Sequence, residues 1–117
     1  MDLKNVYSMS RMRLITGNDS DLAKDFINLF IAQLTFDVIS LEHAVKSNDH
    51  INIRRTARKM TSTLDVFGLN KSGLITREID HCIKENLSVM NVSPLLHKLK
   101  QTLDHDRADM LKSLGSS

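Results

Sequence analysis

The sequence contains few of the residues that punctuate strand-rich folds, with four glycines and one proline among 117 residues. Tight hairpin turns depend on these residues, so their scarcity favours long helices over sheets. Cys82 is the single cysteine, which excludes an intramolecular disulfide framework and a thiolate metal cluster. We therefore expect an all-α protein from a reducing, cytoplasmic compartment.

An excess of one charge sign and a long apolar run are also missing. Sixteen basic residues are offset by 14 acidic ones, and only four phenylalanines and one tyrosine are present. This balance supports neither broad phosphate neutralisation nor base stacking, so nucleic acid is not an expected partner. The longest apolar run, residues 27–34, is interrupted by Asn28 and Gln33, so membrane insertion is not expected either.

Motifs for catalysis are absent from the sequence as well. It has no nucleophilic triad, paired-carboxylate motif or glycine-rich phosphate loop, so we do not expect an enzyme. The five histidines form no ligand pair at helical spacing with one another or with Cys82. We accordingly expect no metal site and no cofactor.

Hydrophobic periodicity indicates a helical bundle in a single domain, residues 1–117. Apolar residues recur every three positions from Leu3 to Ile15, which predicts a short cap helix within residues 1–18. Residues 19–114 should form an antiparallel up-down-up-down four-helix bundle, because short polar turns separate its amphipathic segments, and residues 115–117 a disordered tail. The long helices are predicted from Asp19 or Ser20 to Val45, His50 to Phe67, Asn70 to Glu85, and Ser93 to Leu114.

Helix starts and buried faces follow from the same pattern. Asn70 is a candidate N-cap, and Pro94 is predicted at the first helical position, where its missing N–H costs no hydrogen bond. Leu22 and Leu74 fit the apolar faces of their helices. Asp106 is charged, and we predict it outside the apolar stripe of the last helix.

The second long helix carries the most regular apolar stripe and a basic segment beside it. Its buried face is predicted to consist of Ile53, Ala57, Met60, Leu64 and Phe67. Arg58 lies about 100° from Ala57 and therefore at the edge of the stripe, with Arg54 one turn earlier and Thr61 and Ser62 continuing that side. Such a surface lets a partner approach closely, although a solvated basic face would look the same.

Residues 57–69 resemble the signature of histidine-containing phosphotransfer (HPt) domains, and the phosphorylated histidine of that family would fall on Arg58. The resemblance includes an acidic and apolar helix at residues 21–44 and spans most of residues 8–112. Family members usually have lysine three residues after the histidine and glycine four after, where this chain has Thr61 and Ser62. The matching positions are Ala57, Met60, Leu64, Phe67, Gly68 and Leu69.

The resemblance implies a phosphorelay module whose partner is a response-regulator receiver domain or a hybrid sensor kinase. A guanidinium stays protonated and cannot replace the neutral imidazole that phosphoryl relay requires, so Arg58 should bind without relaying phosphate. It could contact the acidic pocket of a receiver domain instead. The predicted partner-binding residues are Arg54, Arg58, Lys59, Thr61, Ser62 and Asp65, and the structural residues are Ala57, Met60, Leu64, Phe67 and Gly68.

Three alternatives remain at this point. The chain could be a helical scaffold or homodimerising bundle unrelated to phosphorelay, although we expect a monomer rather than a dimer. It could be an active phosphotransfer protein in which Arg58 is an engineered replacement of histidine. Another histidine could also serve, and His81 is the best placed because antiparallel pairing about Gly68 brings it level with position 58.

Overall fold

The computed structural model describes residues 20–115, and within them the chain forms four long α-helices and one short 3₁₀ turn. The cap helix predicted in residues 1–18 lies outside the described residues. The last helix extends through Gly115, the first residue of the predicted tail at 115–117, and residues 116–117 are not described. The elements are α2 (Ser20–Lys46), α3 (His50–Val66), α4 (Asn70–Lys84), η2 (Val89–Asn91) and α5 (Val92–Gly115).

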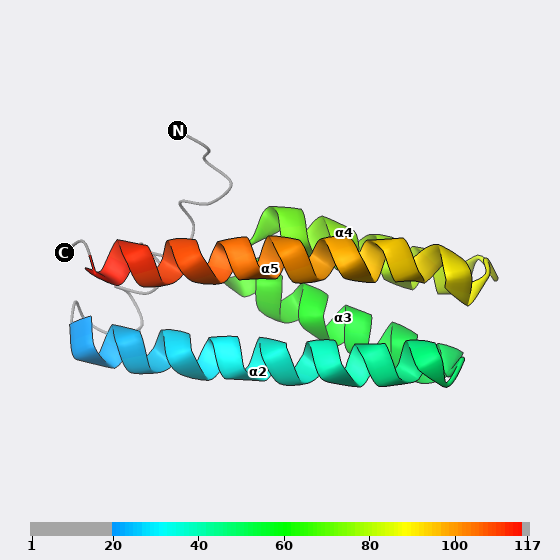
Figure 1. Ribbon diagram of the computed structural model, residues 1–117, viewed down its shortest axis with the longest axis horizontal. Helices are drawn as coiled ribbons and strands as arrows, with labels where there is room; N and C mark the ends of the chain where they lie inside the picture. The colour runs from blue at the N-terminus through cyan, green and yellow to red at the C-terminus, as the bar shows by residue number, and fades with distance from the viewer. Residues whose placement is uncertain (1–19, 116–117) are drawn as a thin grey trace.

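The four long helices run alternately in opposite directions along one common axis (Figure 1). Helix α2 packs against α3 and α5, and α4 packs against the same two helices. Each helix of this ring can therefore bury its apolar stripe against two neighbours. The predicted antiparallel four-helix bundle is confirmed, and no described helix is both long enough and apolar enough to span a membrane.

Polar and glycine residues close the turns at both ends of α3. At the start, Asp49 caps the helix, because its side chain accepts a hydrogen bond from the backbone N–H of Asn52 at 3.2 Å. At the end, Gly68 has φ of 68°, a left-handed conformation that glycine adopts without strain. The N–H of Gly68 then bonds the carbonyl of Asp65, and that of Leu69 bonds the carbonyl of Leu64, which together form a Schellman cap.

Two predicted helix starts are shifted by the structure. Leu69, not Asn70, occupies the N-cap of α4, and no side chain caps that end. Helix α5 begins at Val92, so Pro94 is its third residue rather than its first. The proline still lies in the first turn, where a backbone N–H has no intrahelical acceptor and its loss costs little.

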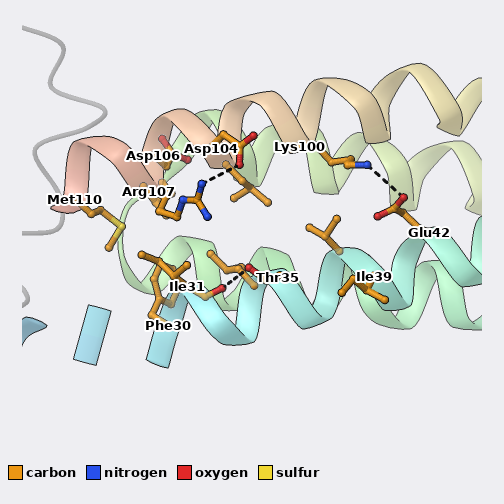
Figure 2. Close-up of a pocket in the computed structure, with 14 residues that line it drawn as sticks. Phe30, Ile31, Thr35, Ile39, Glu42, Lys100, Asp104, Asp106, Arg107 and Met110 are labelled. Carbon is orange, nitrogen blue, oxygen red and sulfur yellow. Dashed lines mark hydrogen bonds and ion pairs between the residues drawn. The ribbon is translucent and has the colours of Figure 1, made fainter. Parts of the chain in front are cut away.

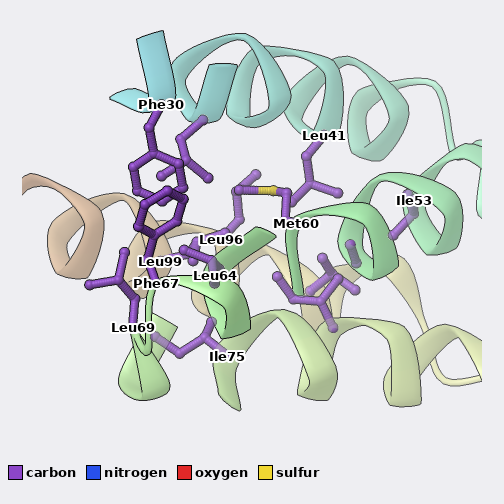
Figure 3. Close-up of a cluster of buried hydrophobic side chains, with 14 of the residues drawn as sticks. Phe30, Leu41, Ile53, Met60, Leu64, Phe67, Leu69, Ile75, Leu96 and Leu99 are labelled. Carbon is purple, nitrogen blue, oxygen red and sulfur yellow. The ribbon is translucent and has the colours of Figure 1, made fainter. Parts of the chain in front are cut away.

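The core lies along the bundle axis, where the stripe of α3 meets the other three helices (Figure 3). Ile53, Ala57, Met60 and Leu64 are fully buried, and Phe67 is nearly so. The rings of Phe67 and Phe30 pack with centroids 4.0 Å apart, which ties the end of α3 to α2. The five residues predicted to form the buried face of α3 are therefore confirmed as core residues.

Three predicted side-chain positions were wrong. Leu22 and Leu74 are about half exposed, because they lie beyond the edges of the apolar stripes of α2 and α4. Asp106 is buried although we predicted it outside the stripe of α5. Its carboxylate accepts a hydrogen bond of 2.7 Å from the Ser72 hydroxyl on α4, and this partner offsets part of the cost of burying a polar group.

Candidate partner-binding site

The exposed face of α3 is fixed by the burial of the opposite face. Ala57 and Met60 are fully buried, so Arg58 between them must point to the outside of the bundle. Within residues 20–115, its guanidinium forms no ion pair and no hydrogen bond. Arg58 is therefore a cation presented to solvent from a helix that the core holds in place.

Arg54, one turn before Arg58, is held in an ion pair. Its Nε donates to the Oδ1 atom of Asp80 on α4 at 2.8 Å, and both side chains are partly buried. The pair joins α3 to α4 and neutralises the charge of Arg54 locally. Arg54 thus acts mainly as a support for the neighbouring surface.

Thr61, one turn after Arg58, is turned into the seam between α3 and α4. Its hydroxyl oxygen lies 2.9 Å from the Ala57 carbonyl, to which it donates, and 2.6 Å from the hydroxyl oxygen of Thr76. Thr76 is buried, and because Thr61 already donates to Ala57, the single hydroxyl proton of Thr76 goes to Thr61; the Thr76 oxygen also lies 3.0 Å from the Gly73 carbonyl oxygen. Thr61 therefore contributes to helix packing, and little of its hydroxyl is left for a partner.

Asp65 is also engaged with α4, where its carboxylate pairs with the Arg77 guanidinium. Gly73 makes room for this pair, because a Cβ atom at that position would lie 3.2 Å from Asp65 Oδ1. On the other side of α3, Lys59 Nζ lies 3.3 Å from Oδ1 of the buried Asp37 on α2. The side chain of Lys59 therefore points toward α2, whereas Arg58 lies on the side of α3 that borders α4.

The structure therefore divides the six residues predicted to bind a partner. Arg54, Thr61 and Asp65 bond to α4, and Lys59 bonds to α2. Arg58 and Ser62 are exposed and bond to no other described helix, and the Ser62 hydroxyl donates only to the Arg58 carbonyl, at 3.2 Å. The candidate site narrows to the surface around Arg58.

Sequence reasoning missed residues that share a groove with Arg58. Arg55 and His50 come from α3, and Lys84 comes from the last turn of α4. Lys84 is distant from Arg58 in the sequence, and only the pairing of α3 with α4 brings the two to one groove. Arg55 belongs to the basic segment of α3. Its position on the outer face of that helix was the sequence signal that could have identified it as a groove residue.

A second groove lies between α2 and α5, on a different side of the bundle from Arg58 (Figure 2). Its floor is apolar and includes Phe30, Ile31 and Met110. A salt bridge of 3.3 Å between Lys100 and Glu42 crosses it from α5 to α2. No predicted site residue lines this groove.

Two buried acidic groups away from Arg58 have shifted pKa values. Burial raises the pKa of Asp106 above its usual value, and nearby Asp109 adds to the shift, although the Ser72 hydrogen bond works in the opposite direction. Burial likewise raises the pKa of the Cys82 thiol, with a smaller effect from Glu78. Cys82 is thus held as a neutral thiol in the core. Within residues 20–115, no three histidine, cysteine or acidic side chains gather as metal ligands would.

Residues 20–115 thus form an antiparallel four-helix bundle that presents an exposed cation, Arg58, on α3. A crystal structure of the HPt domain from the Hpt sensor hybrid histidine kinase of Shewanella is similar to it, with a TM-score of 0.71 and 17% sequence identity. The match covers 97% of this chain and 97% of that one. The HPt resemblance is confirmed at the level of the fold. No family model and no curated protein sequence matches the chain.

Proposed function

We propose that this chain is an HPt-like phosphorelay module that binds response-regulator receiver domains in the cytoplasm without carrying the phosphoryl group itself. The observation that carries the proposal is the place of Arg58, exposed on α3 where the HPt resemblance puts the phosphorylated histidine. A hybrid sensor kinase that contains a receiver domain would be an equivalent partner. The module would act as a competitor or regulator of a relay.

The chemistry of Arg58 supports binding over transfer. A guanidinium remains protonated at physiological pH and has no free lone pair to attack an aspartyl phosphate. It does donate two parallel hydrogen bonds to a carboxylate or phosphoryl group. Neighbouring Ser62 is small and exposed, so a partner surface can come close to the helix at this point.

Binding is tested by titrating isotope-labelled protein with response-regulator receiver domains and following the amide chemical shifts by NMR. We expect the shifts to centre on the exposed face of α3 around Arg58. Arg58→Glu should weaken binding in calorimetry, whereas Lys98→Glu, an equal charge reversal on the exposed face of α5, should not. Equal affinity of both variants would contradict the proposal.

Absence of transfer is tested separately, by incubating the chain with a receiver domain that carries a radiolabelled phosphoryl group. We expect no label on this chain. A label that is lost in acid but survives alkali would show that a histidine accepts phosphate, and His81→Gln would then identify or exclude the exposed histidine on α4. Either labelled result would overturn the claim that the module binds without relaying.

A second candidate function, a homodimerising or adaptor bundle, rests on the outer face of α2. Leu29 and Phe36 lie seven residues apart and are 71% and 63% exposed. Apolar residues with this spacing form one stripe along a helix, which another helix could cover. Sedimentation analysis decides between the two: a dimer abolished by Phe36→Glu supports this candidate, and a monomer at all concentrations supports the receiver-binding module.

A further inference from the structure

A basic groove lies between the first half of α3 and the last turn of α4. The residues that give it its character are His50, Arg54, Arg55, Arg58, Ile83 and Lys84, and no acidic residue lines it. Ile51, 72% exposed, adds an apolar edge. The groove thus combines several cations with a patch that a partner could cover.

The cations in this basic groove are unequally compensated. Arg54 is neutralised by Asp80 at 2.8 Å. Arg55 only approaches the neutral amide of Asn52, with Nη1 3.4 Å from Oδ1. Arg58 and Lys84 have no acidic partner within the described part of the chain.

Three cations without counter-charges therefore face the same groove. Like charges that share a groove repel one another, and an incoming anion removes that repulsion as well as adding its own attraction. The Arg54–Asp80 pair also fixes the wall from which Arg58 projects, so less ordering is needed when a partner binds.

We propose that the basic groove receives clustered carboxylates of the partner protein, with Arg58 at its centre and Arg55 and Lys84 as residues that determine specificity. The identity of the partner as a receiver domain rests on the proposed function. Arginine suits this task because its planar fork bonds a carboxylate through two donors. The small net charge of +2 and the few aromatic residues disfavour nucleic acid as the occupant.

The decisive experiment measures receiver binding to Arg55→Glu and Lys84→Glu in the full chain. Each reversal should lower the affinity about tenfold at low salt, and the loss should shrink as ionic strength rises. Lys98→Glu on α5 is the matched control, because it changes the net charge equally on another face. Arg55→Gln and Lys84→Gln remove the charge without reversing it, so each should lower the affinity less than the corresponding Glu variant. Circular dichroism verifies that every variant folds.

A second titration separates failure of the groove from failure of the proposed function. Inorganic phosphate, added to the chain alone at constant ionic strength, should shift the amides around Arg55, Arg58 and Lys84. If these shifts occur but no receiver domain binds, the basic groove is confirmed as an anion-binding site and the receiver domain is excluded as its partner. If a receiver domain binds equally well to the two Glu variants and Lys98→Glu, the groove is overturned and the proposed function stands. Binding of a short DNA duplex as tightly as the receiver domain would overturn the choice of carboxylates.

Discussion

The pair formed by Lys59 and Asp37 gives the sharpest test of how α3 is held against α2. Asp37 is 2% exposed, and its Oδ1 accepts from Gln33 at 3.0 Å and from Lys59 at 3.3 Å. Its Oδ2 is buried without a hydrogen-bond partner. Lys59→Met keeps the aliphatic stem but removes the cation, so a buried carboxylate is left with one neutral donor.

The expected cost follows from the geometry of the pair. Two unit charges 3.3 Å apart attract by about 5 kcal/mol at an effective dielectric constant of about 20. The side chain of Lys59 is 55% exposed, so solvent and the loss of rotamer freedom remove most of that attraction. We expect Lys59→Met to lower the free energy of unfolding by about 1–2 kcal/mol.

Urea denaturation of the single and double variants measures this coupling. In an Asp37→Asn background, Lys59→Met should cost less than about 0.5 kcal/mol, because no buried charge then needs a partner. Lys98→Met controls for loss of an exposed lysine and should be close to neutral. Equal effects of Lys59→Met in the two backgrounds would refute the reasoning.

Two further predictions concern the core. Met60→Ala removes a fully buried side chain and should lower the free energy of unfolding, measured by urea denaturation, by about 3 kcal/mol. The control Met90→Ala changes an 80% exposed site and should lower it by less than about 0.5 kcal/mol. Similar losses in the two variants would contradict the assigned packing. Because the folded-state pKa of Asp106 is raised, its ionised form destabilises the bundle above that pKa. Asp106→Asn should therefore stabilise the protein at neutral pH, with a gain that shrinks as pH falls through the folded pKa; a gain independent of pH would exclude this cause.

The fold was predictable because periodicity and turn chemistry agree along most of the chain. The stripe of α3 repeats at helical spacing from Ile53 to Phe67, and Gly68 ends it at a position that requires left-handed backbone. Asp106 shows where residue type misled. It lies three residues after Leu103 and four before Met110, so spacing alone places it on the buried face, and only its charge suggested exposure.

The candidate site was predictable only in part, because side-chain partners come from other helices. The position of Arg58 follows from its neighbours on α3, and the sequence was sufficient for that. The ion pair between Arg54 and Asp80 and the position of Lys84 in the basic groove both depend on the register between α3 and α4. A single sequence fixes that register to no better than about a turn, so it cannot say which exposed charges are already paired.

The same register explains why the site would differ from a phosphotransfer site even with a histidine at position 58. The HPt resemblance places a lysine where this chain has Thr61, and Thr61 is turned inward against Thr76. No cation can therefore reach position 58 from that point to stabilise phosphoryl oxygens. Arg58 supplies a positive charge at the surface instead, between two supports, the Arg54–Asp80 and Asp65–Arg77 pairs. Under the proposed function, Arg58 and Thr61 act in one direction: Arg58 provides no nucleophile, Thr61 provides no cation, and the exposed guanidinium of Arg58 is the charge that a partner would bind.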